Sequence, residues 1–305
     1  MTVRTALQQG QQLLEDAGVT APRLTAEVLL MHAIALEHKC DRAWLYAHSG
    51  DELREVWWIH YGRYLHERMQ GKPTQYITGR QEFYGREFRV TPDVLIPRPE
   101  TEHLIEAALA HANAAEAALA RTPPPLDHPR GSEKSGALRI LDIGAGSGAI
   151  AVTLALETKG HVFATEVSKA ALHIAAENAR GLGADVSLVA SDLGSAFANG
   201  SFDMVVSNPP YVPSRDRDTL SREVRDFEPA LALYGGEDGL DVYRRLIPEA
   251  RRLLKRGGWL IMELGYESSG PVREMLGDWL DIEVLSDLAE ISRVIVAKSP
   301  APTKQ

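Results

Sequence analysis

The sequence predicts an α/β protein in which a doubly wound sheet follows a small helical domain. Two observations predict this fold class. From residue 137 onward apolar strands alternate with helical stretches, whereas residues 3–70 show only the three- and four-residue spacing of helices. The length of 305 residues exceeds one average domain, and 44% hydrophobic and 25% charged residues are typical of a soluble globular chain.

Charge and cysteine content argue against several classes of protein. Lys and Arg number 33 against 42 Asp and Glu, and the net charge of −9 lacks the basic excess of general duplex binding, so we expect no direct nucleic-acid partner. Cys40 is the single cysteine, which excludes an internal disulfide and disfavours a metal site, as in a reducing cytoplasm. With no apolar leader and no apolar run near ~18 residues, we expect no membrane contact.

The first part of the chain is expected to be a helical domain at residues 1–74. Its aromatic residues recur at helical spacing, which favours packing over a base-stacking surface. At residues 75–97 the apolar period falls toward two around Tyr76-Ile77 and Phe83-Tyr84, with Gly79 and Gly85 between, and this predicts a β-hairpin linker.

Residues 98–305 are expected to form the α/β domain. It begins with a helix at residues 100–121, followed by a proline-rich, mobile loop at residues 121–136. The last connection, residues 286–293, is too short for a crossover, so the final strand should run antiparallel while the others are largely parallel. Seven strands are expected, at residues 138–143, 162–167, 186–190, 204–207, 259–263, 282–285 and 294–297.

A glycine-rich segment, Asp142-Ile143-Gly144-Ala145-Gly146-Ser147-Gly148, ends the first of these strands and opens a helix. Glycines allow a tight turn close to a ligand, and free N–H groups at a helix start favour an anionic end. Glu166 ends the second strand, where a carboxylate accepts hydrogen bonds from a ribose diol. An adenosine-type cofactor is indicated, but the segment also fits the relaxed dinucleotide fingerprint, so a nicotinamide or flavin cofactor stays open.

Two acidic residues have alternative interpretations: Asp192, and Asp142 at the start of the glycine-rich segment. Asp192, with Leu193 after it, follows the third strand and is placed to meet the amine and ring of adenine, or else to cap a helix. Asp142 either orients the glycine segment or holds a ligand ammonium.

The fourth strand stops at Asn208-Pro209-Pro210-Tyr211. Two prolines lack N–H donors and must leave the sheet, which explains the prolines but not Asn208 or Tyr211. Pro209 confines Asn208 to extended conformations, so its side-chain oxygen and a neighbouring carbonyl converge as two acceptors for an NH2 group. Tyr211 would lie against the planar group that carries this nitrogen.

These motifs resemble S-adenosylmethionine-dependent methyltransferases that act on planar amino or amide nitrogens. Further stretches, among them Gln75-Tyr76-Ile77-Thr78-Gly79, Leu95-Ile96-Pro97-Arg98-Pro99-Glu100-Thr101-Glu102 and Phe227-Glu228-Pro229, resemble the peptide chain release factor glutamine methyltransferase (HemK/PrmC) family over residues 13–298. The resemblance implies a Rossmann-like methyltransferase domain and a helical domain that helps grip a protein substrate. The methyl acceptor would be the glutamine of the Gly-Gly-Gln motif of bacterial release factors.

The residues therefore expected to bind S-adenosyl-L-methionine are Asp142, Gly144, Ala145, Gly146, Ser147, Gly148, Glu166, Asp192, Leu193 and Asn208. Catalysis and substrate binding are expected at Asn208, Pro209, Pro210 and Tyr211, with Phe83 and Arg98 as further substrate-binding candidates. Phe83 is alternatively a packing residue, and Arg98 with Glu102 a surface pair. Glu263, which ends the fifth strand, either supports the site residues from behind or is a solvated strand end.

Other functions stay open at this point. A dehydrogenase would need a hydride-transfer residue, and none stands out. An adenine-N6 nucleic-acid methyltransferase shares the Asn-Pro-Pro-Tyr motif but should show a basic face. A non-catalytic adaptor would have lost the intact motifs, and a ribosomal-protein glutamine methyltransferase would share the amide pocket.

Overall fold

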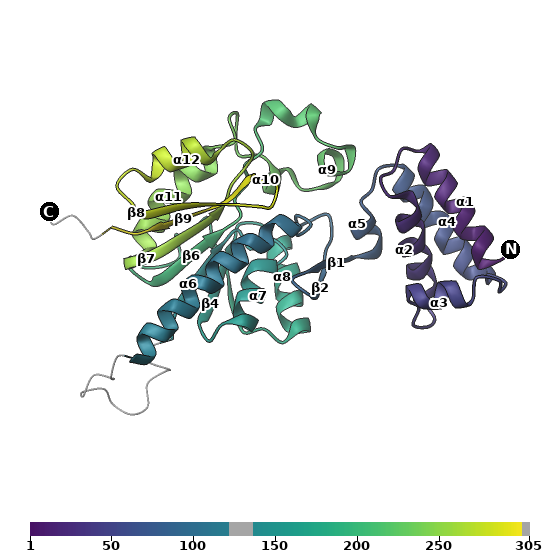
Figure 1. The fold of residues 1–305 in the computed structure, drawn as a ribbon, viewed down its shortest axis with the longest axis horizontal. Coiled ribbons are helices and arrows are strands. Elements are labelled where there is room, and N and C mark those ends of the chain that lie inside the picture. The colour runs from purple at the N-terminus through teal and green to yellow at the C-terminus, as the bar shows by residue number, and fades with distance from the viewer. Residues whose placement is uncertain (122–136, 301–305) are drawn as a thin grey trace. The chain divides into compact units, whose positions relative to one another are not determined.

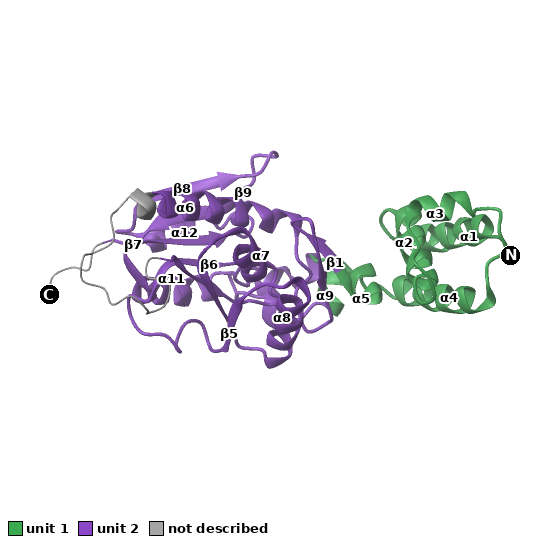
Figure 2. Ribbon diagram, turned by 90° about the horizontal axis from the view of Figure 1, so that it is seen from below, with its two compact units in different colours: residues 1–80, 220–227 green, residues 81–219, 228–305 purple. Residues whose placement is uncertain are grey.

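The computed structural model describes residues 1–121 and 137–300, so the expected proline-rich loop lies outside the described residues apart from Arg121. The chain divides into two compact units (Figure 2). Unit 1 comprises Met1–Arg80 and Leu220–Phe227, and unit 2 comprises Gln81–Thr219 and Glu228–Gln305. The expected domain boundaries at residues 74 and 97 stay predictions.

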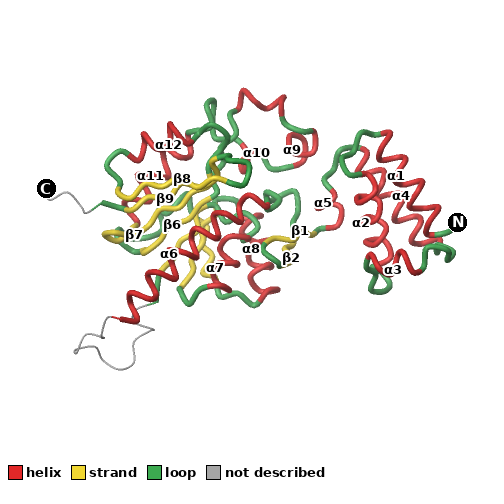
Figure 3. The backbone as a smooth tube through the Cα atoms, viewed as in Figure 1, coloured by secondary structure: helices red, strands yellow, loops and turns green. Residues whose placement is uncertain are grey.

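Unit 1 is helical, as Figure 3 shows. Apolar side chains at helical spacing pack into one core, and the aromatic residues Trp57, Tyr61 and Tyr64 are buried in it, as their spacing predicts. The helices of unit 1 are α1 (Val3–Asp16), α2 (Pro22–Ile34), α3 (Arg42–Ala47), α4 (Glu55–Met69), α5 (Thr74–Thr78) and α9 (Arg222–Phe227).

The linker differs from the sequence prediction at its beginning. Residues 74–78 form helix α5, not a strand, and both Tyr76 and Ile77 are buried, whereas neighbours in a strand would face opposite sides. Gly79, at φ +74°, ends this helix in the left-handed conformation. The two-stranded hairpin is shorter than expected and consists of β1 (Arg80–Phe83) and β2 (Arg86–Arg89).

The hairpin turn depends on backbone conformation and on a carboxylate. Tyr84 and Gly85 both have positive φ, 51° and 70°, as a two-residue type I′ turn requires. Glu102, expected at the surface, accepts a hydrogen bond from the Tyr84 N–H at 2.9 Å. Glu102 thus fastens the hairpin to the helix that it begins, α6 (Glu102–Arg121).

Unit 2 contains a seven-stranded sheet in the order β5-β4-β3-β6-β7-β9-β8, which confirms the predicted fold class. The inner strands are apolar on both faces, as in sheets covered by helices on either side. The strands are β3 (Arg139–Ile143), β4 (His161–Glu166), β5 (Val186–Ala190), β6 (Phe202–Ser207), β7 (Leu254–Glu263), β8 (Leu280–Ser286) and β9 (Ser292–Lys298).

The last strand runs antiparallel to both β7 and β8, as predicted, and lies between them, while β3 to β7 pair in parallel. Strand β7 begins five residues before the expected start at Trp259. Lys255, Arg256, Gly257 and Gly258 form an irregular stretch of the strand, where the pairing partner shifts from Leu254 to Trp259.

Helices cover both faces of the sheet (Figure 1). On one face α6 packs with α7 (Ala149–Glu157) and α8 (Lys169–Leu182); on the other lie α11 (Asp241–Leu253) and α12 (Ser269–Leu276). Each face has its own apolar core. The remaining short elements are the 3-10 helices η1 (Pro99–Thr101) and η2 (Ser214–Thr219) and the helix α10 (Ala230–Leu233).

Within residues 1–121 and 137–300, no helix is both long and apolar enough to traverse a lipid bilayer.

Candidate functional site

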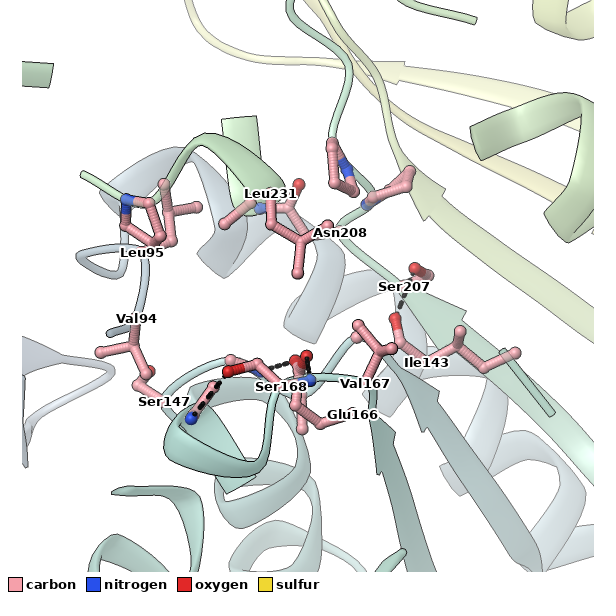
Figure 4. A pocket seen from close by; sticks show the side chains of 18 of the residues that line it. Val94, Leu95, Ile143, Ser147, Glu166, Val167, Ser168, Ser207, Asn208 and Leu231 are labelled. Atoms are coloured by element: carbon pink, nitrogen blue, oxygen red, sulfur yellow. Dashed lines mark hydrogen bonds between the residues drawn. The ribbon is translucent and has the colours of Figure 1, made fainter. Parts of the chain in front are cut away.

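Unit 2 contains a pocket of about 410 Å³ at the carboxyl ends of β3, β4 and β6. The chain runs outward from β3 to β5 and then returns to β6 on the other side of β3, which makes this edge the switch point of the sheet. Ligands of doubly wound folds bind at such a point. Figure 4 shows Leu95, Glu166, Asn208 and Leu231 around one opening.

Most of the sequence-predicted site residues line this pocket. Four do not: Asp142, Gly148, Tyr211 and Phe83. Phe83 is 1% exposed and packs edge-on against Phe88, as the packing alternative expects. The predicted residues that line the pocket are Gly144, Ala145, Gly146, Ser147, Glu166, Asp192, Leu193, Asn208, Pro209, Pro210 and Arg98.

The glycine segment is a turn whose backbone conformation only glycine adopts without steric strain. Gly144, Gly146 and Gly148 have φ of 85°, 54° and 83°. A Cβ at Gly148 would also lie 3.2 Å from the Cα of Ala175 in α8. Gly148 therefore acts in packing the turn onto α8, while Gly144 and Gly146 bring the backbone to the pocket wall.

Asn178 of α8 holds the glycine segment in place. Its Nδ2 donates to the carbonyl oxygen of Ser147 at 2.8 Å and to that of Arg89 at 3.0 Å, and its Oδ1 accepts from the Arg89 N–H at 2.7 Å. Asn178 is 5% exposed. Sequence reasoning missed this residue because an asparagine inside a helix carries no local signal of such a role.

Glu166 ends β4 with its carboxylate beside the glycine segment. One oxygen accepts from the Gly146 N–H and the other from the Ser168 N–H, each at 2.9 Å. Each carboxylate oxygen can accept a second hydrogen bond, so the pair remains available to a ligand diol. Glu166 thus both fixes the turn and faces the pocket (Figure 4).

Asp142 lies buried beneath the glycine segment. Its Oδ2 accepts from the Ala151 N–H in the first turn of α7 at 3.2 Å, and its Oδ1 has no hydrogen-bond partner among the described residues. The pKa of Asp142 is raised to about 7, chiefly by burial; the hydrogen bond from Ala151 opposes the rise, and the nearby Glu166 charge adds to it. The contact with α7 supports the orienting role over a ligand contact.

Replacement of Asp142 by Asn is expected to stabilise the protein at alkaline pH. A carboxyl group whose pKa is raised in the folded state favours folding while it is protonated. Its favourable contribution to the free energy of unfolding is therefore fully present below about pH 4 and is lost between about pH 4 and pH 7. The amide introduced by Asp142→Asn does not titrate, so the variant should gain on the order of 4 kcal/mol over wild type at about pH 8.5. Calorimetric melting across pH checks this; a gain independent of pH contradicts it, and Asp185→Asn at an exposed site serves as control.

Asp192 is tied to the opposite wall of the pocket. Its carboxylate pairs with the Arg245 guanidinium of α11 at 2.6 Å, and both side chains are more than half exposed. The helix-cap alternative gains no support from this carboxylate, because the Ser195 N–H donates to the backbone oxygen of Asp192 instead, at 3.3 Å. Arg245 is a pocket residue that sequence reasoning missed.

The Asn-Pro-Pro-Tyr turn follows β6 and divides between pocket and core. Asn208, Pro209 and Pro210 line the pocket, and Asn208 Nδ2 donates to Thr101 Oγ1 at 3.2 Å. The Tyr211 hydroxyl instead donates to Glu263 Oε1 at 3.0 Å, and its ring lies beside Gly265. The expected contact of Tyr211 with a planar substrate group has no support in this arrangement.

Glu263 is 2% exposed at the end of β7, so it is not the solvated strand end that was one of its two alternatives. Its Oε2 accepts from Thr101 Oγ1 at 2.6 Å. Burial raises the pKa of Glu263, while the hydrogen bonds from Thr101 and Tyr211 oppose this rise. Glu263 is therefore joined to Asn208 through one hydroxyl group.

Arg98 has a buried partner that differs from the expected one. Its guanidinium pairs with Glu228, whose side chain is 1% exposed, and Glu228 also accepts from the Ile96 N–H at 3.3 Å. This charge pair fixes the segment around Pro97 that forms one wall of the pocket.

A pocket at the ends of β3 and β4, faced by an Asn-Pro-Pro turn after β6, places this chain in the class of S-adenosylmethionine-dependent methyltransferases. The sequence profile of the methyltransferase small domain matches residues 132–226, and that of the PrmC N-terminal domain matches residues 5–79. The catalytic domain of hMettl16, solved in complex with a MAT2A 3'UTR hairpin, has the same fold, with a TM-score of 0.51 and 17% identity over 79% of this chain and 84% of that one.

The family follows from full-length relatives. The release factor glutamine methyltransferase of Koribacter versatilis is 45% identical over 98% of this chain and 99% of its own length. That of Moorella thermoacetica is 39% identical over 97% and 98%. The chain belongs to the release factor glutamine methyltransferase family, as its motifs predicted.

Proposed function

We propose that this protein transfers a methyl group from S-adenosylmethionine to the side-chain amide nitrogen of the glutamine in the Gly-Gly-Gln motif of bacterial release factors. The full-length similarity to release factor glutamine methyltransferases supports the activity. With release factors as substrates, the reaction belongs in the cytoplasm, where they work, and needs no direct nucleic-acid contact.

The residues of the pocket fit the cofactor. The glycine segment brings its backbone to the wall, and Glu166 retains acceptor capacity for a ribose diol. Asp192 and Leu193 line the side proposed for adenine. Bound S-adenosylmethionine supplies an electrophilic methyl group on a sulfonium sulfur.

The task of the substrate side is to make an amide nitrogen nucleophilic. Its lone pair is delocalised into the carbonyl group, which is the resonance that flattens the amide. In the proposal Asn208 Oδ1 and the Pro209 carbonyl oxygen accept both N–H bonds, so that the lone pair points toward the cofactor and growing positive charge on nitrogen meets two acceptor dipoles. Orientation supplies the rest, without a general base.

The remaining predicted residues have supporting parts in the proposal. Pro210 shapes the turn and Arg98 the facing wall, while Tyr211 braces Glu263 from the core. Phe83 packs inside unit 2, and the proposal gives it no substrate contact. Unit 1 is proposed to help grip the protein substrate, in line with the match of its residues to the PrmC N-terminal domain.

The observation that carries the proposal is the position of Asn208, in the pocket with its Nδ2 already engaged. Incubation with labelled S-adenosylmethionine and purified release factors, followed by peptide mapping, tests it. Label on the glutamine of Gly-Gly-Gln is the expected result. Label confined to a ribosomal protein or to adenine in DNA contradicts the proposal, as does failure to label any release factor.

A further inference from the structure

The amide of Asn208 belongs to a hydrogen-bonded chain that begins at a buried carboxylate. Asn208 Nδ2 lies 3.2 Å from Thr101 Oγ1, and Thr101 Oγ1 lies 2.6 Å from Glu263 Oε2. Thr101 is 4% exposed and Glu263 2% exposed. Asn208 directly follows β6, Thr101 ends η1 and Glu263 ends β7. Because the three residues are far apart in the chain, no single stretch of sequence predicts their contact.

The hydrogen bonds of this chain run in one direction, from Asn208 Nδ2 to Thr101 Oγ1 and from Thr101 Oγ1 to Glu263 Oε2, as they must when Glu263 is ionised. An ionised carboxylate only accepts hydrogen bonds, and Glu263 receives two hydroxyl groups, from Thr101 and Tyr211. The Thr101 hydroxyl has one proton and donates it in the hydrogen bond to Glu263. Toward Asn208 it can then only accept, which requires the NH2 group of Asn208 to face Thr101.

With its NH2 group directed at Thr101, the Asn208 amide has its oxygen, Oδ1, on the opposite side. An asparagine side chain is nearly symmetric in shape, and its terminal torsion is broad and roughly two-fold, so shape alone does not choose between its two orientations. Reversed, the amide would present N–H donors to the N–H donors of a substrate carboxamide. It would then attract a carboxylate, which offers only acceptors.

We propose that Glu263, acting through the Thr101 hydroxyl, is a positioning residue that holds the Asn208 oxygen toward the pocket and thereby selects a carboxamide over a carboxylate as methyl acceptor. This inference rests on the proposed function, because it concerns the same amide pocket. It assigns specificity to two residues that do not themselves accept the substrate N–H bonds. A site built to pair a polar group rejects an analogue that leaves its own group unpaired.

The test replaces Thr101 by Val, which has nearly the same shape and no hydroxyl, and by Ser, which keeps the hydroxyl. For Thr101→Val we expect kcat for release factor methylation to fall about 10- to 100-fold while KM and cofactor affinity change little. Thr101→Ser should retain most of the activity. Thr101→Ala replaces the Val variant if melting shows that Val impairs folding.

A second readout separates positioning from general damage. Binding of a release factor is compared with binding of the same factor carrying glutamate in Gly-Gly-Gln, with S-adenosylhomocysteine present to prevent turnover. Thr101→Val should move the preference toward glutamate by at least about tenfold, and Thr101→Ser should not. An unchanged preference, or an equal loss of activity in both variants, overturns the inference. Failure of the wild-type protein to methylate release factors would instead contradict the proposed function, while the binding comparison would still decide the inference.

Discussion

Asn208→Ala is expected to lower kcat for methyl transfer about 10²- to 10³-fold, the typical effect of removing one preorganised polar group from a reaction site. The oxygen of Asn208 is proposed to accept one of the two substrate N–H bonds, and without it the amide is neither oriented nor stabilised as charge develops. Thr101 and Glu263 contact each other independently of this oxygen, so the pocket should otherwise persist.

Single-turnover methylation of a release factor measures this loss, and calorimetry measures cofactor affinity, which should stay within about threefold of wild type. Asn199→Ala is a matched control, because Asn199 is an exposed asparagine outside the pocket. Turnover near the wild-type rate in the Asn208 variant would remove the central residue of the mechanism. A parallel loss of cofactor binding would instead assign Asn208 to binding of the cofactor.

Glu166→Ala is expected to weaken S-adenosylmethionine binding about 10- to 100-fold, because hydrogen bonds to a charged group contribute about 1.5–3 kcal/mol. Two effects act in the same direction. The ribose diol loses its acceptors, and the N–H groups of Gly146 and Ser168 lose the carboxylate that holds the glycine segment.

Titration calorimetry with the cofactor gives the dissociation constant directly. Glu166→Gln separates the two effects in part, because its amide keeps one acceptor oxygen and should bind with intermediate affinity. Asp278→Asn removes an exposed carboxylate outside the pocket and should leave binding unchanged. An unaltered constant for Glu166→Ala would disprove the ribose assignment.

Local signals predicted the parts of the site that depend on backbone conformation. Glycines at residues 144 and 146 were readable because their positive φ values disfavour other residues, and Pro209 was readable because it must end a strand. The same logic gave the short last connection and hence the reversed strand β9.

Contacts between distant residues were beyond such signals. The sequence left Glu263 open between a supporting role and a solvated strand end, and its contact with Thr101, 162 positions away in the chain, favours the first. Arg98 and Glu228 are 130 positions apart, so the buried partner of Arg98 had no spacing to reveal it. The helix α5 was mistaken for a strand because two adjacent apolar residues, Tyr76 and Ile77, fit either structure when the segment is short.

The three hydrogen bonds of Asn178 have a mechanical consequence. One amide holds the turn that lines the pocket and, through Arg89, the end of β2, from which the chain continues directly into the Pro92 and Val94 wall. Neither side can shift without bending or breaking bonds to a helix that is itself packed on the sheet. The turn under the pocket and the wall at Pro92 and Val94 are therefore held in a fixed position relative to α8 and to each other.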